Sequence, residues 1–181
     1  MTGSIRSLSA IISVVALACA LTACSDKLGG QPAPVSSDPS SQPSATSDTP
    51  LAGLSPCATL DKALTGQGFP AAAPTAADPE HSCATTKPQV GTVGLMLQDG
   101  RTINEDLGDP SKTKTGTVHE RAAILEPGYL GTSSGCAVDM EVKPKSRVTV
   151  SGTLSTGTTD QACDFARSAA EAVELLLPKN S

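Results

Sequence analysis

Aromatic side chains are scarce in this chain of 181 residues, which contains two Phe, one Tyr and no Trp. A folded core must therefore be built from Val, Leu, Ile, Ala and Met, and such a core is thin for a chain of this size. Basic patches interleaved with aromatic residues are also missing, which argues against nucleic acid as a partner.

Sequence signals of familiar catalytic and metal sites are scarce as well. No phosphate-binding run of Gly-Lys-Ser/Thr occurs, and the cysteines lack the paired spacing of a zinc site, although His81 lies near Cys83. We interpret His119-Glu120-Arg121, and also Asp139 with Glu141, as solvated strand faces rather than acid–base groups. The serines of residues 132–135 are not interpreted as nucleophiles. We therefore expect a non-enzymatic protein without metal or cofactor.

The first 23 residues have the pattern of a secretory signal. Arg6 is their only charged residue, and the apolar run from Leu8 to Leu21 is short for a transmembrane helix, which needs roughly 20 apolar residues. The run ends in Leu21-Thr22-Ala23-Cys24, which has the order of a lipoprotein signal: one aliphatic residue, two small residues and a cysteine. We predict cleavage between Ala23 and Cys24 and lipidation of Cys24. An ordinary cleaved signal with a chance cysteine is the alternative.

Lipidation would make the membrane itself a partner. Two or more acyl chains, palmitate among them, contribute about 0.8 kcal/mol per buried methylene and would hold the protein at the extracytoplasmic face of the cell membrane. The segment from Ser25 to Ala52 has five prolines and seven serines and can bury little apolar surface. We interpret residues 24–52 as the lipidated cysteine and a disordered tether, either a spacer or a tail without a length requirement.

Residues 53–181 should form one domain stabilised by disulfides. Four cysteines remain after the signal and the anchor, and in an oxidising compartment this even number predicts two bridges among Cys57, Cys83, Cys136 and Cys163. Three pairings are possible. The expected elements favour Cys57–Cys83 and Cys136–Cys163, each of which would join the start of a helix to a strand. Loops of this size predict about 3 to 4 kcal/mol per bridge in the chain-entropy model.

Hydrophobic periodicity predicts an α+β fold, in which a small antiparallel sheet carries a short N-terminal helix and a C-terminal helix. Helices are expected from Cys57, over Thr102–Leu107, and after Thr158, which has capping-box spacing to Gln161. Strands are expected around Val93–Leu97, Thr117–Leu125, Cys136–Val142 and Arg147–Leu154, the last two paired with each other.

A groove between the sheet and its helices is the expected binding site, lined by the aliphatic residues Leu95, Val118, Ile124 and Leu125. A lipid or a hydrophobic peptide would suit such a lining. A protein partner would instead dock on an exposed strand face or on the edge of Arg147 to Leu154.

Several features together resemble one protein family: the lipobox at Cys24, the Ser/Pro-rich tether, Ser55-Pro56-Cys57 before a short helix, Gly135-Cys136-Ala137-Val138, and Ala162-Cys163-Asp164-Phe165-Ala166. They resemble the actinobacterial cell-envelope lipoproteins that carry the domain of unknown function 3558. The resemblance covers Leu54 to Pro178 and implies a lipid-anchored envelope protein with two disulfides and no established catalytic residues. Many members have an aromatic residue after the second cysteine, where this chain has Ala84.

The expected layout is also similar to that of PsbP/Mog1-like domains, which mostly act as adaptors or binding modules. Together these predictions describe a membrane-anchored cell-envelope lipoprotein that acts as a ligand-binding or accessory module. A structural adaptor on a membrane protein complex is the second hypothesis. The third is an envelope hydrolase that acts through His119 or Asp139.

Overall fold

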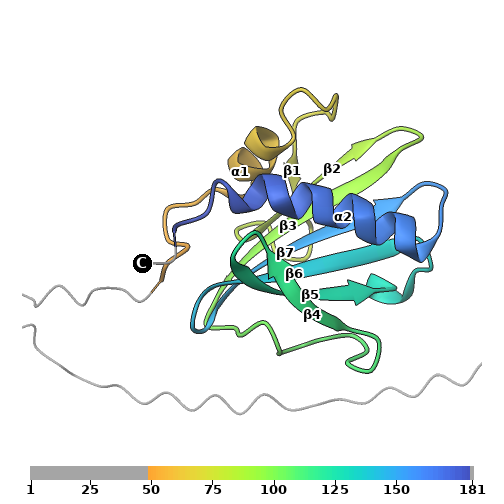
Figure 1. Cartoon of the computed structure of the whole chain (residues 1–181). Helices are drawn as coiled ribbons and strands as arrows, with labels where there is room; N and C mark the ends of the chain where they lie inside the picture. Colours follow the sequence, from red (N-terminus) through yellow and green to blue (C-terminus); the bar gives the residue numbers. More distant parts are fainter. Residues whose placement is uncertain (1–48, 180–181) are drawn as a thin grey trace, which may run out of the picture. The chain divides into compact units, whose positions relative to one another are not determined.

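A computed structural model describes residues 49–179, so the predicted signal, the cleavage site at Ala23 and the lipidated Cys24 lie outside the described residues. The helices are α1 (Pro56–Ala63), the 3-10 helix η1 (Tyr129–Gly131) and α2 (Thr159–Glu174). The strands are β1 (Ala73–Pro74), β2 (Ser82–Lys87), β3 (Gly91–Asp99), β4 (Lys114–Val118), β5 (Arg121–Pro127), β6 (Gly135–Lys143) and β7 (Ser146–Leu154). The predicted α+β fold is confirmed (Figure 1).

All the strands belong to one antiparallel sheet, in the order β1-β2-β3-β7-β6-β5-β4. Both α-helices pack on one face of it: α1 contacts β2 and β3, α2 contacts β4 to β7, and the two helices contact each other. Figure 1 shows α2 lying across this face. Every second residue of β3 points into the core between sheet and helices, namely Val93, Leu95 and Leu97. The predicted β6–β7 pairing is also confirmed.

The two disulfides join helices to strands in the predicted pairing. Cys57 at the start of α1 pairs with Cys83 of β2, and their Cα atoms are 5.1 Å apart. Cys136 of β6 pairs with Cys163 in the first turn of α2, with 4.9 Å between the Cα atoms. Both distances lie in the usual range for a bridge.

Helix α2 begins as its sequence predicts. The hydroxyl of Thr158 accepts the backbone N–H of Gln161, and the amide oxygen of Gln161 accepts the N–H of Thr158, which completes a capping box. The helix approaches β7 closely at Gly152, where a Cβ atom would lie 2.9 Å from Phe165 Cδ1 and 3.1 Å from the Cα of Ala166. Small residues on both sides therefore set the distance between helix and sheet.

Three predicted elements differ from the structure. The expected strand over Thr117–Leu125 is the hairpin of β4 and β5, with a turn at His119 and Glu120. The expected helix over Thr102–Leu107 does not form, and residues 100–113 make irregular turns instead. Leu51, predicted to lie in the tether, is buried in the core, so the packed domain begins before Gly53. No helix within residues 49–179 is long and apolar enough to cross a bilayer.

Candidate functional site

The four aliphatic residues predicted to line one groove do not lie together. Leu95 is buried in the core between sheet and helices. Val118 and Leu125 line a small hollow of about 180 Å³ between the β4–β5 hairpin and Arg167 of α2. Ile124 points to the opposite face of the sheet, because neighbouring residues of a strand alternate in direction and Leu125 packs on the helix side. The structure thus divides these residues among the core, one hollow and the opposite face.

The sequence pattern predicts a solvated strand face at His119-Glu120-Arg121, and this prediction is wrong. His119 and Glu120 form a turn, and Arg121 is only 2% exposed. The Arg121 guanidinium donates to Glu174 of α2 (3.3 Å from Nη2 to Oε1) and to the carbonyl oxygen of Pro178 (2.9 Å). His119 Nδ1 lies 3.1 Å from Glu174 Oε2. Since these contacts join the end of α2 to the β4–β5 hairpin, the segment has a structural role.

The remaining sequence candidates do not assemble a reactive site. His81 Nδ1 lies 2.9 Å from Asp78 Oδ1, and this hydrogen bond between two exposed side chains raises the pKa of His81 and lowers that of Asp78. No group of three His, Cys, Asp or Glu side chains is placed to hold a metal ion within residues 49–179. Gly131, Ser133 and Gly135 have the spacing of a nucleophile elbow, but η1 and β6 flank them instead of a strand and a helix.

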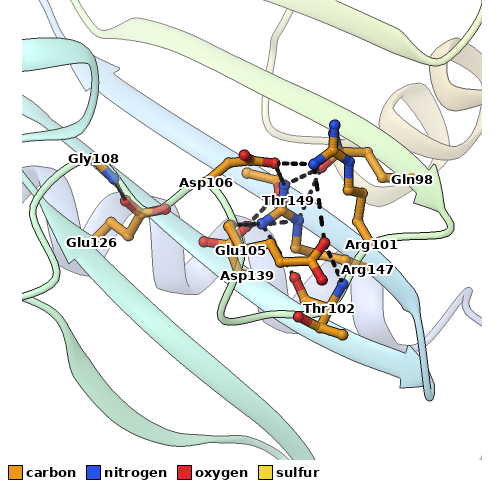
Figure 2. Close-up of polar contacts among 10 residues, drawn as sticks. All are labelled: Gln98, Arg101, Thr102, Glu105, Asp106, Gly108, Glu126, Asp139, Arg147 and Thr149. Atoms are coloured by element: carbon orange, nitrogen blue, oxygen red, sulfur yellow. Dashed lines mark hydrogen bonds and ion pairs between the residues drawn. The ribbon is translucent and has the colours of Figure 1, made fainter.

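A polar cluster lies on the sheet face opposite the helices (Figure 2). The strand register brings its members together: Asp139 of β6 lies directly across from Thr149 of β7, and Arg147 of β7 lies across from Gln98 of β3. Glu126 of β5 is a diagonal neighbour of Asp139, within reach of a long side chain. Because strand side chains alternate, all five residues share one face.

Arg147 fastens the loop between β3 and β4 over this face. Its side chain is 5% exposed, and Nη2 donates to Gln98 Oε1 at 2.7 Å. Nη1 donates to the carbonyl oxygens of Thr102 and Glu105 in the loop. These hydrogen bonds tie the first part of the loop to the sheet face as the chain crosses from β3 to β4 at the far edge of the sheet.

Asp139 is the most unusual member of the cluster, because its side chain is ionisable and only 1% exposed. Oδ1 accepts a hydrogen bond from the Thr149 hydroxyl and lies 3.7 Å from Arg147 Nε. Oδ2 is buried and has no hydrogen-bond partner. The interpretation of Asp139 as part of a solvated face is therefore wrong. No local signal in the sequence marks this burial, because Asp139 alternates with apolar neighbours as a solvated strand residue would.

Burial raises the pKa of Asp139 to about 7, and the nearby carboxyl of Glu126 acts in the same direction. The Thr149 hydroxyl and Arg147 lower the pKa. Because Oδ2 has no hydrogen-bond partner, the charged form of Asp139 is costly in the free protein.

The cluster lines an inner hollow of about 180 Å³, bounded by Met96, Gln98, Asp106, Glu126, Tyr129, Asp139, Arg147 and Thr149. An outer hollow of about 650 Å³ lies between residues 106–112 and 127–133. Asp106, Glu126 and Tyr129 line both hollows, so the two adjoin. We call the two together the carboxyl cleft. Glu126 also accepts the backbone N–H of Gly108 at 2.9 Å, which fixes the loop that forms one wall.

The rim of the carboxyl cleft has unusual backbone geometry. Leu130 is 81% exposed and has a left-handed φ of 54°, between Gly128 (φ 74°) and Gly131 (φ 73°). Asp106 on the facing loop also has a positive φ, of 57°. Non-glycine residues in this conformation cost free energy and gather at functional sites. A ligand in the outer hollow would cover the exposed Leu130.

A further hollow, of about 540 Å³, lies beside the segment of residues 49–54 and includes Asp78 and His81. Those two side chains are exposed and paired with each other. Among residues 49–179, the buried side-chain oxygen or nitrogen without a partner is Asp139 Oδ2, in the carboxyl cleft. The carboxyl cleft is therefore the stronger candidate site.

Comparison with known proteins gave no match: no family model, no curated protein and no solved structure is significantly similar to this chain. The resemblance to envelope lipoproteins stays a prediction from the residues that carry it.

Proposed function

We propose that this chain is a lipid-anchored, non-enzymatic binding module of the cell envelope, with the carboxyl cleft as its ligand site. Asp139 Oδ2 carries the proposal, since it is a buried carboxyl oxygen without a partner in a hollow that adjoins a larger one. A group left unsatisfied in this way costs about 1 to 3 kcal/mol. A ligand that donates a hydrogen bond to Oδ2 would recover this free energy on binding.

The location at the membrane is supported by the amino-terminal sequence. Leu21-Thr22-Ala23-Cys24 follows a short apolar run and precedes a Ser/Pro-rich segment, as in exported lipoproteins. We expect the wild-type protein to sediment with membranes and Cys24→Ser to be released into the soluble fraction. Release of both proteins, or of neither, would contradict the anchor.

Binding explains the cleft better than catalysis does. His119 lies in the β4–β5 turn beside Glu174 of α2, whereas Asp139 lies on the sheet face opposite the helices. The two residues of the hydrolase hypothesis are therefore not in one site.

An adaptor function loses one of its predicted surfaces. The stretch from Arg147 to Leu154 lies within β7, which occupies the centre of the sheet between β3 and β6. It therefore presents no free edge for a partner strand. Docking on the rim around Leu130 is compatible with the structure, but that rim belongs to the carboxyl cleft.

Native mass spectrometry tests the proposed function. The chain with Cys24→Ser, exported through an oxidising compartment of a cell that makes the protein naturally, should carry a bound small molecule that leaves on denaturation. The same mass should be absent from Asp139→Asn and present in Glu120→Gln, a matched change of an exposed carboxylate to its amide. A protein without bound mass, or a bound mass that Asp139→Asn retains, would contradict the assignment of the cleft.

A further inference from the structure

We infer that the carboxyl cleft binds a primary ammonium group on an unbranched alkyl arm, with the ammonium group placed between Glu126 and Asp139 in the inner hollow. This inference rests on the proposed binding function and specifies the class of its ligand.

The charges that line the inner hollow favour a cation. Asp106, Glu126 and Asp139 contribute three carboxyl groups and Arg147 contributes one guanidinium, while Asp106 Oδ2 is already paired with Arg101 Nη1 at 2.7 Å. That guanidinium already donates to Gln98 and to the loop carbonyls, and it lies on the Oδ1 side of Asp139. The unpaired Oδ2 is the oxygen available to a ligand. Glu126 and Asp139 are therefore the carboxyls that can balance a bound cation, and their ionised forms would repel an anionic ligand.

Hydrogen-bonding capacity points to an ammonium group in particular. An alkylammonium has three N–H donors and no acceptor, and the hollow offers the unpartnered Oδ2 of Asp139 and the carboxyl of Glu126 as acceptors. A metal ion would need at least three ligating groups placed together, and residues 49–179 offer no such set. A volume of about 180 Å³ accommodates the end of an alkylammonium chain, whereas a large ring system would not fit.

The outer hollow suits the rest of the arm. Tyr129 lines both hollows, and Leu130 provides an exposed apolar side chain at the rim. Lys112 also lines the outer hollow, but its Nζ lies 2.8 Å from Asp109 Oδ2, so this wall already contains a paired charge. An alkyl chain can pass along Tyr129 while its ammonium group remains in the inner hollow.

Protons should compete with such a ligand. In the free protein, a proton on the buried Asp139 keeps this carboxyl neutral, and a bound ammonium group would displace that proton. The charged and titratable groups that face Asp139 are Glu126 from β5, Arg147 from β7, Asp106 from the β3–β4 loop and Tyr129 from η1. Alkylamines keep their charge up to about pH 10, so the pH dependence below pH 8 reports on the protein.

Isothermal titration calorimetry of the mature chain with Cys24→Ser tests the inference with 1,5-diaminopentane and with Nα-acetyl-lysine amide. The neutral control is 1,5-pentanediol. If this diol binds as tightly as the diamine, the ammonium assignment is wrong. Affinity for the amine should be about 30-fold weaker at pH 5.5 than at pH 8, because one proton is displaced from a group with a pKa of about 7. Affinity that does not change with pH would overturn the inference.

Asp139→Asn and Glu126→Gln should each weaken amine binding by about 10- to 100-fold, the usual effect of losing a charged hydrogen bond. Glu120→Gln should leave it unchanged, and thermal unfolding shows whether each variant is folded. Preference for the diamine over the lysine derivative would indicate a free amine as the natural ligand, and the opposite preference a lysine side chain.

Failure of the inference can be told apart from failure of the proposed function. If no amine binds, but native mass spectrometry finds a ligand that Asp139→Asn loses, the ammonium assignment is wrong and the cleft remains the binding site. If amines bind equally well to wild type, Asp139→Asn and Glu126→Gln, the cleft itself is not the site and both proposals fail.

Discussion

Replacement of Asp139 by Asn should change how the stability of the protein depends on pH. The pKa of Asp139 is about 7 in the folded protein and about 3.9 in an unfolded chain. Because the folded state holds the proton more tightly, this carboxyl lowers stability progressively as pH rises from about 4 to about 7, and the loss is constant above that range. At about 1.4 kcal/mol per pKa unit, the full effect is about 4 kcal/mol.

The assay is urea unfolding of wild type and Asp139→Asn between pH 4 and pH 8, with both disulfides intact, followed by circular dichroism. The unfolding free energy of Asp139→Asn minus that of wild type should increase by about 4 kcal/mol from pH 4 to pH 8. Taking this difference cancels the contributions of other carboxyls, such as the exposed Asp109, whose pKa is lowered to about 2 mainly by its hydrogen bond with Lys112. Glu120→Gln is the matched control and should show a flat difference. A flat difference for Asp139→Asn as well would refute the reasoning.

Two further predictions concern the packing that supports the cleft. Arg121→Met leaves the partly buried Glu174 without its guanidinium partner and should lower the unfolding free energy, measured in urea, by about 3 to 5 kcal/mol. The control Arg167→Met removes an exposed ion pair and should change the unfolding free energy by less than about 1 kcal/mol. Equal effects would contradict the buried role of Arg121. Gly152→Ala forces α2 away from β7 and should cost about 1 to 3 kcal/mol, while Gly116→Ala, where a Cβ meets nothing within 4 Å, should be close to neutral by thermal unfolding. A neutral Gly152→Ala would contradict the close packing of the helix.

The frame of the fold could be predicted from the sequence because its signals are local. The capping box of Thr158 and Gln161 depends only on spacing along the chain, and the structure confirms it. The same holds for the alternation of Val148 and Val150 and for the pairing of β7 with β6. The disulfide pairing could be predicted because each cysteine pair joins two elements whose order along the chain was already predicted.

The candidate site could not be predicted, because it depends on contacts between residues far apart in the sequence. Asp139 alternates with apolar residues, as a solvated residue would, and only the loop of residues 100–113 crossing above it makes it buried. Arg147 holds that loop through Thr102 and Glu105, more than 40 residues away in the chain. Glu126 comes close to Asp139 only through the β5–β6 register, which the sequence pattern did not predict.

The most direct test of the carboxyl cleft is to follow the carboxyl carbon of Asp139 by NMR during a pH titration of the mature chain with Cys24→Ser. In the free protein the midpoint should lie near pH 7, and addition of 1,5-diaminopentane should lower it because the bound ammonium group favours the carboxylate. A midpoint near pH 4 that the amine does not change would show that Asp139 is an ordinary carboxylate, and it would contradict the assignment of the cleft.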